Sequence, residues 1–577
     1  MSYCIIIIPM HIDIVPNRAS TPTVLLRESY REGNKVKKRT LANLSSLSMD
    51  QVEAIRQILK GEVLVPVTEV FETVSSFHHG HVKAVHAAMN QLGIEKLIGS
   101  RPSRERDLVL AMVAARIVEP ESKLATTRWW QNTTLPEVFH VGNASEDDLY
   151  GAMDWLLARQ DSIEKKLAAR HLGEGGLVLY DLSSSYFEGT HCPLAMRGHN
   201  RDGKKGKLQV NYGLLSSSLG IPVAISAFAG NVSDPLTVME QVTKVREEFG
   251  IGEMVLVGDR GMISQGHIEK LRKETGIDWI TAVKSGAIRK LITSESLQLG
   301  LFDERNLFEF IHPDYPGERL IACKNPDLAK LRGHKRQALL DATVKELEKV
   351  RRMVEGGRLK DKEQIGLRVG KVINKYKMAK HIALDIQDTQ FNWQIKDEKV
   401  NEERSLDGIY IIRTSVTVER MSSEDTVRSY KDLSNVERAF RSMKSIDLEV
   451  RPIYHHLENR VRAHLFLCML SYYVKWHMME AWRPLLFADE DVEAKKTRDP
   501  VAAARRGAKA LQKAQSKHLD DGTEVHSFQT LLKSLATIVR NKCRYKDTRH
   551  KAPTFLMDTI PGKEQQRAFD LLATIRM

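Results

Sequence analysis

Residues 177–283 constrain the fold of this chain more than any other stretch. Short apolar runs bounded by turn residues are typical of buried strands, and amphipathic segments between them are typical of helices. The expected elements are strands at 177–180, 209–215 and 222–228, a helix at 235–249, a strand at 253–258, a helix at 264–275 and a strand at 278–283. This alternation predicts an α/β domain built on one sheet.

The order β, β, β, α, β, α, β, with acidic residues closing the first and fourth strands, is that of a ribonuclease H-like domain. We expect smaller regions around it. The expected organisation is a start-site extension at residues 1–9, an N-terminal domain at 10–175, the catalytic domain in two parts at 176–284 and 407–482, a basic insertion at 285–406, and a basic helical C-terminal region at 483–577. For residues 1–9, a short edge strand is the alternative.

The N-terminal domain is expected to begin with a small basic β unit. Gly33-Asn34 suits a tight hairpin turn, and the basic run that follows contains Lys37, Lys38 and Arg39. Asp50 is expected to cap a helix at 51–60, and the sequence pattern predicts further helices through residue 170. Such a module can lie on DNA, but a plain helical accessory domain explains these residues equally well.

The net charge favours a polyanionic partner. The chain has 87 Lys and Arg against 74 Asp and Glu, with a pI of about 9.3. Between Asp327 and Lys380 there are 16 Lys or Arg against 7 Asp or Glu. A solvated face and a surface that follows a phosphate backbone both explain this excess. The candidate phosphate contacts in this region are Lys330, Arg332, Lys335, Arg336, Arg351 and Arg352.

Cysteine usage and hydropathy exclude several other classes. The five cysteines are far apart, odd in number and without a CxxC pair, which argues against a disulfide scaffold or a structural zinc site. No stretch approaches the roughly 18 apolar residues that cross a bilayer. We therefore expect no membrane association and a cytoplasmic, nucleoid-associated protein.

Three acids are candidates for chemistry. Asp181 and Asp259 each follow a predicted strand, where ligands bind in open α/β sheets, and their oxygens suit Mg²⁺ or Mn²⁺. Glu437 lies seven residues before Lys444, so on a helix both share one face, with Arg441 one turn from each. The alternative for Glu437 is a capping box that starts at Ser434.

Four motifs in this order resemble the DDE transposases of bacterial insertion sequences. The first is Asp181 in Tyr-Asp-Leu-Ser-Ser; the others are Gly230-Asn231-x-x-Asp234, Asp259-Arg260-Gly261, and Tyr430 with Glu437 and Lys444. The resemblance covers about residues 176–476. It points to the insertion-sequence-four superfamily, in the branch whose last motif reads Tyr, Arg, Glu, Lys. Leu433 stands where that motif has its Arg, and Arg441, with Arg438 behind it, is the candidate substitute.

The resemblance implies a transposase that cleaves the ends of its element and transfers the strands into target DNA. It implies that Asp181, Asp259 and Glu437 hold two Mg²⁺ ions, with Mn²⁺ as a substitute. The residues expected to hold flanking phosphates are Tyr430, Arg441, Lys444, Arg438 and Arg260. His455 and His456 are not expected to be metal ligands.

The implied partners are the terminal inverted repeats and target DNA. Because two ends must be cut and joined to one target, we expect a homodimer in the DNA complex. A metal-dependent nuclease of the same fold without strand transfer is the alternative function. A non-catalytic DNA-binding relic is a third, and the three intact acids argue against it.

Overall fold

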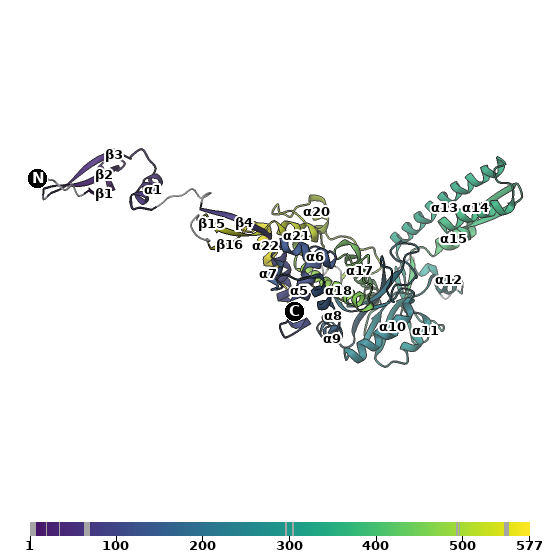
Figure 1. Cartoon of the computed structure of the whole chain (residues 1–577). Coiled ribbons are helices and arrows are strands. Elements are labelled where there is room, and N and C mark those ends of the chain that lie inside the picture. Colours follow the sequence, from purple (N-terminus) through teal and green to yellow (C-terminus); the bar gives the residue numbers. More distant parts are fainter. Residues whose placement is uncertain are drawn as a thin grey trace. The chain divides into compact units, whose positions relative to one another are not determined.

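The structure is a computed structural model that describes residues 7–18, 20–33, 35–62, 70–294, 297–302, 305–491, 494, 497–546 and 553–576. Two compact units are present. The first contains residues 1–77 and 540–559, and the second contains residues 78–539 and 560–577. Figure 1 shows the elements of both units.

The first unit begins with an antiparallel sheet of order β1-β2-β3, formed by Ile7–Val15, Thr23–Glu32 and Lys35–Asn43, followed by helix α1 (Met49–Leu59). The hairpin predicted at Gly33 is confirmed: its φ of 62° favours glycine. Asn34 lies outside the described residues. Ser48, not Asp50, caps α1. Residues 7–9 belong to the edge strand β1, and residues 1–6 lie outside the described part.

A second sheet of this unit was not expected from the sequence. Its order is β16-β15-β4, with β4 at Phe71–His78, β15 at Val539–Tyr545 and β16 at Thr554–Asp558. The expectations of an all-helical region after residue 50 and of a helical C-terminal region are therefore wrong at these strands. Each strand is short, and β4 pairs with a segment more than 400 residues away, which no local pattern reveals.

The second unit is built on an eight-stranded mixed sheet of order β10-β11-β14-β9-β8-β5-β6-β7. Its strands are β5 (Gly176–Tyr186), β6 (Gln209–Ser217), β7 (Pro222–Ala229), β8 (Met254–Val257), β9 (Ile277–Ala282), β10 (Leu307–Phe310), β11 (Arg319–Lys324) and β14 (Ile409–Thr414). Parallel pairing joins β5, β8 and β9, and the other pairs are antiparallel. With α10 between β7 and β8 and α11 between β8 and β9, the predicted element order is confirmed.

Helices cover both faces of this sheet because side chains of β5 alternate between two cores. Tyr180 packs with residues of α10 (Asp234–Thr243) and α11 (Gln265–Leu271), such as Val238 and Ile268. Leu179 points to the opposite face, into a core that includes α17 (Leu433–Arg441) and α18 (Glu458–Ala481). The apolar run at 465–470 lies buried in α18, as expected. Among the described residues, no helix is both long and apolar enough to cross a membrane.

The helices between residues 80 and 171 belong to this second unit and share the core of α18. They are α3 (Gly80–Gln91), α4 (Ile94–Ile98), α5 (Arg104–Val118), α6 (Lys123–Trp129), α7 (Leu135–Val138), α8 (Glu146–Leu157) and α9 (Gln160–His171). Later helices join them: α20 (Ala508–Ser516), α21 (Phe528–Ala536) and α22 (Lys563–Leu572). Residues 10–175 are thus divided between two units instead of forming one domain. Helices α3 and α5 pack against α18, and α3 also packs against α21 and α22, so this part of the chain shares the core of the second unit.

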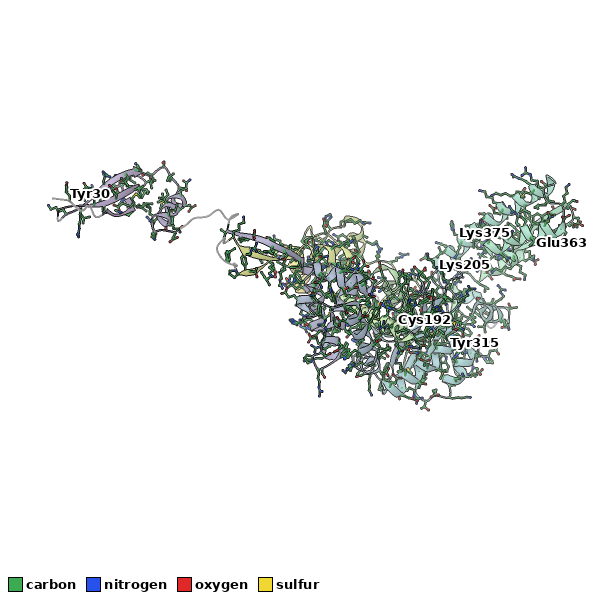
Figure 2. The ribbon with its side chains drawn as sticks, in the orientation of Figure 1. Tyr30, Cys192, Lys205, Tyr315, Glu363 and Lys375 are labelled. Carbon is green, nitrogen blue, oxygen red and sulfur yellow. The ribbon has the colours of Figure 1, made fainter. Side chains whose placement is uncertain are left out.

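The basic insertion is smaller than predicted. β11 pairs with β14 and β10 pairs with β11, so both strands extend the main sheet. The part outside the sheet consists of α13 (Pro326–Glu355), α14 (Lys362–Tyr376), the hairpin β12 (Ile382–Gln387) and β13 (Gln390–Ile395), and α15 (Asp397–Ser405). This part has its own apolar core. Helix α14 lies beside α13 and returns toward the sheet: Figure 2 shows Glu363 at its outer end and Lys375 nearer the sheet.

The remaining elements are α12 (Ser285–Thr293), α16 (Ser423–Lys431), the π-helical turns η2 (Lys244–Glu248) and η5 (Ser442–Ile446), and the 3₁₀ turns η1 (Trp130–Asn132), η3 (Leu299–Phe302), η4 (Ala379–His381) and η6 (Arg483–Leu485).

Candidate active site

The strand register brings Asp181 and Asp259 to the same level of adjacent strands. β5 and β8 are parallel, with Leu179 opposite Val257. Asp181 lies two residues beyond Leu179, and Asp259 lies two residues beyond Val257. Because side chains two residues apart in a strand share a face, both carboxylates lie at the end of this parallel pair.

The expectation that Asp181 ends its own strand is wrong. β5 continues to Tyr186 because its residues 178–186 pair with β6. The parallel neighbour of β5, β8, ends at Val257, so Asp181 lies just beyond the parallel pairing. Asp259 lies in the turn after β8, where its Oδ1 accepts hydrogen bonds from the backbone N–H groups of Gly261 and Met262.

Helix α17 supplies Glu437. Its apolar side, with Val436 and Phe440, is buried on the same face of the sheet as Leu179, and Glu437 is exposed on the other side. The β6–β7 turn fixes the helix in place: Asn435 donates a hydrogen bond to the carbonyl of Ser218. At the neighbouring Gly220, with φ of 81°, a Cβ atom would lie 2.7 Å from Cβ of Asn435, so only glycine allows this approach.

The structure differs from the sequence-based alternative of a capping box at Glu437 and from the expectation that Glu437 and Lys444 share a helical face. The capping box does not form, because α17 begins at Leu433 with Asp432 as its N-cap and Ser434 lies inside the helix. Glu437 and Lys444 do not share a regular helical face either, because the α-helix gives way at Ser442 to the π-helical turn η5. A π turn has more residues per turn and shifts the side chains that follow.

The carboxylates influence one another electrostatically. Burial raises the pKa of Asp181 to about 7, and the charges of Asp259 and Glu437 add to the rise, whereas a hydrogen bond from the N–H of Leu182 and the charge of Arg201 oppose it. Burial also raises the pKa of Tyr430 to about 12, with Asp259, Glu437 and Asp181 contributing. The charges of these groups act on one another, and Asp259, Tyr430 and Glu437 also line one groove.

The donor set fits a divalent cation. In the part of the chain that the structure describes, no Lys or Arg forms an ion pair with Asp181, Asp259 or Glu437. Three carboxylates that form no direct ion pair are costly to hold near one another unless a cation lies among them, and hard oxygen donors suit Mg²⁺ or Mn²⁺. Among the described residues, no group of three or more His, Cys, Asp or Glu side chains is already arranged closely enough to hold a metal ion.

A groove of ≈ 930 Å³ adjoins this site. Asp259, Arg260, Tyr430 and Glu437 line one side of it, and residues of α13 and of the segment before β14 line the other. Two of the expected phosphate contacts on α13, Arg332 and Lys335, are exposed and line this groove. The structure thus brings part of the basic insertion next to the acids.

Other expected DNA contacts are engaged within the protein. Lys444 is buried and paired with Asp202 at 3.1 Å, and Arg336 makes two hydrogen bonds to Asp407. Arg351 and Arg352 contact Glu348 within α13. In the first unit, Lys37, Lys38 and Arg39 pair with Glu32, Asp13 and Glu28.

Three of the expected DNA contacts and the two histidines lie outside the groove. Arg438 and Arg441 are exposed on α17 but do not line the groove, and neither does the exposed Lys330. Leu433, at the position of the motif's Arg, is buried in the core. His455 and His456 lie away from the three carboxylates, in a different pocket.

The loop between β5 and β6 contains contacts near the site that were not predicted from the sequence. Arg201 pairs with Asp234, which gives the Gly230-Asn231-x-x-Asp234 motif a structural role. The next residue, Asp202, is almost fully buried and binds Lys444, Arg451 and the backbone N–H of Tyr186. Lys205, labelled in Figure 2, lies in the same loop. The run Arg-Asp-Gly-Lys-Lys-Gly-Lys between two apolar strands is the signal that could have identified it.

Comparison with known proteins identifies the family. The model of the transposase DDE domain matches residues 184–474, which includes Asp259 and Glu437 and begins three residues after Asp181. The model of the IS1634 family transposase N-terminal domain matches residues 12–64. No curated protein matches the chain. Among solved structures, it is similar to a piggyBac transposase in a synaptic complex with hairpin DNA, at 9% identity and a TM-score of 0.34, over 79% of this chain and 77% of that chain.

The DDE-domain match implies a ribonuclease H-like fold, dependence on a divalent metal and binding of DNA. It covers half of the chain and agrees with the order of strands and acids described above. Together with the N-terminal match, it shows that this chain belongs to the DDE transposases, in the IS1634 family, whose members cleave DNA and transfer its strands during transposition.

Proposed function

We propose that Asp181, Asp259 and Glu437 are the three acids of the DDE site and that they hold two Mg²⁺ ions, which Mn²⁺ can replace. The observation that carries the proposal is the mutual electrostatic influence of these acids at the end of the β5–β8 pair, where none of the described Lys or Arg residues forms an ion pair with them. When bound, the ions would activate the attacking oxygen and stabilise the leaving oxygen of a phosphodiester.

The residues of the chain position the DNA for this step. Tyr430 lines the groove beside Asp259 and Glu437, and Arg260 adds a cation at its wall. We propose that these side chains hold the phosphates that flank the scissile bond, which orients it for in-line attack. With water as the attacking group the product is a nick. With a 3′-hydroxyl end of the element in its place, the product is a strand joined to target DNA.

One experiment distinguishes this function from a nuclease of the same fold. The full chain is incubated with Mg²⁺, DNA that carries the ends of the flanking element and a circular target, and the products are sized. We expect cuts at the terminal inverted repeats and joined products in the target. Nicks without any joined product would favour the nuclease.

The groove suggests which basic residues contact the DNA. We expect Arg332→Ala with Lys335→Ala to weaken binding to all DNA sequences about tenfold and to reduce its salt dependence, because fewer counterions are released. The matched control is Arg351→Ala with Arg352→Ala, on the same helix, where both residues already contact Glu348. Anisotropy titrations at several salt concentrations measure both. An equal loss in the two variants would contradict a DNA path along the groove.

Recognition of the element's ends and assembly are further parts of the proposal. The first unit, with its basic strand β3, is proposed to bind the terminal repeats. The protein is proposed to form a homodimer in the DNA complex because two ends are joined to one target.

The Tyr-Arg-Glu-Lys signature stays a prediction, since Leu433 is a core residue and Lys444 pairs with Asp202.

The raised pKa of Asp181 predicts a pH-dependent stability in metal-free protein. Its pKa of about 7 in the folded state is above the ordinary value of 3.8, so its contribution to stability is present below pH 3.8 and is lost as pH rises through 7. Asp181→Asn is therefore expected to melt above the parent protein at pH 8 and close to it at pH 4. Mg²⁺ at pH 8 should raise the melting temperature of the parent protein but not of Asp181→Asn. Equal Mg²⁺ stabilisation of both would remove Asp181 from the metal site.

A further inference from the structure

A second pocket lies within the helical part of the second unit. Its volume is ≈ 780 Å³, and its walls come from the end of α5, the start of α6, α8 and the segment from Glu449 into α18. None of the three DDE acids lines it.

Two buried cations form the inner wall of this pocket. Lys123 is 4% exposed and Arg116 is 7% exposed. Arg116 donates a hydrogen bond to the carbonyl of Glu121. Within the described ranges, no carboxylate forms an ion pair with either cation. A buried ammonium group without a partner is costly, so the pocket is short of negative charge.

A third cation of the pocket, Arg460, also indicates a shortage of negative charge. The guanidinium of Arg460 lies over the ring of Tyr150 at 4.2 Å, and its Nε is buried without a hydrogen-bond partner. Burial lowers the pKa of His455 to about 3, with Lys123 and Arg116 contributing, so this imidazole is neutral and compensates no charge. Burial also lowers the pKa of Lys123 to about 7, and Arg116 adds to that effect.

The acidic residues of the pocket do not neutralise its inner wall. Glu121 and Glu449 are exposed, and Glu146 is hydrogen-bonded to Tyr150. A tetrahedral anion with several acceptor oxygens fits this arrangement, because it can accept from ammonium and guanidinium groups together.

We propose that this pocket binds a phosphate group through Lys123, Arg116 and Arg460, and that in the DNA complex this group is a backbone phosphodiester. The choice of DNA rests on the proposed function and on a link to the active site. Arg451 lines the pocket and binds Asp202, which also binds Lys444 in the turn directly after the Glu437 helix. A series of contacts therefore leads from the turn after the Glu437 helix, through Lys444, Asp202 and Arg451, to the wall of this pocket.

The test uses the full chain, inorganic phosphate and a DNA duplex that carries the element's ends. Phosphate, compared with chloride at equal ionic strength, should raise the melting temperature of the parent protein and of Lys123→Arg, but not of Lys123→Met or Arg460→Met. Lys123→Met should also weaken DNA binding about tenfold and lower the slope of its salt dependence by about 1. The control is Lys165→Met, an exposed cation on α9 outside the pocket.

The outcomes separate the two sources of phosphate. Competition between DNA and phosphate supports a backbone contact. A phosphate effect that needs Lys123, with DNA binding unchanged, supports a phosphate site for a free anion and overturns the DNA assignment. No phosphate effect on the parent protein, with parental DNA binding by Lys123→Met, overturns the proposal. Asp181→Asn, which tests the proposed catalytic function, should keep the phosphate effect, so the two proposals can fail independently.

Discussion

Asp181→Asn, Asp259→Asn and Glu437→Gln are each expected to lower the rate of nicking and of strand joining about a thousandfold, which corresponds to about 4 kcal/mol of transition-state stabilisation. Each amide keeps the shape of the side chain and removes the charge that binds the metal. DNA binding should persist or tighten, because a negative charge near the phosphates is lost. Of the three properties, the rate of the chemical step should change most and the stability of the fold should change least.

Glu437→Gln is the most informative of the three variants. A glutamine is accepted in a capping box, but Ser434 lies inside α17, so a structural role of that kind does not explain Glu437. Rates measured with Mg²⁺ and pre-nicked or intact end DNA separate hydrolysis from joining. Glu269→Gln, an exposed acid on α11, is the matched control and should retain parental rates. Parental nicking by Glu437→Gln would leave the site without its third ligand.

The parts of the fold that depend on local pattern could be predicted from the sequence. The strands β5 to β9 contain short apolar runs, the helices α10 and α11 separate the last three of them, and Asp181 and Asp259 each follow such a run. The sequence therefore predicted the order of elements and the two aspartates. It could not show that β5 continues past Asp181, because that extension depends on pairing with β6.

Non-local pairing explains the other differences. β4 is a short strand whose neighbour β15 comes from the far end of the chain. β10 and β11 extend the main sheet although they lie in the part of the sequence predicted to be an insertion.

The expected role of Lys444 assumed a continuous helix after Glu437. The π-helical turn at Ser442–Ile446 and the buried Asp202 change its surroundings, and neither follows from residue spacing.

Asp202→Asn is expected to destabilise the second unit by about 3–5 kcal/mol, because it leaves two buried or half-buried cations without their shared carboxylate. The side chain of Asp202 is 1% exposed, and it joins the β5–β6 loop to the turn after α17. The loss should affect catalysis indirectly, since this contact holds the chain near Glu437. Urea unfolding of the full chain followed by intrinsic fluorescence measures the change.

A double-mutant cycle assigns the role of Lys444. If its main interaction is with Asp202, Lys444→Met should destabilise the protein, and Asp202→Asn combined with Lys444→Met should cost about 1–3 kcal/mol less than the sum of the single changes. A Lys444 that serves DNA alone would instead lower strand transfer with no change in unfolding free energy and no coupling to Asp202. Because Arg451 keeps Asp202 paired in Lys444→Met, that variant is expected to fold, and its strand-transfer rate can be measured beside its stability.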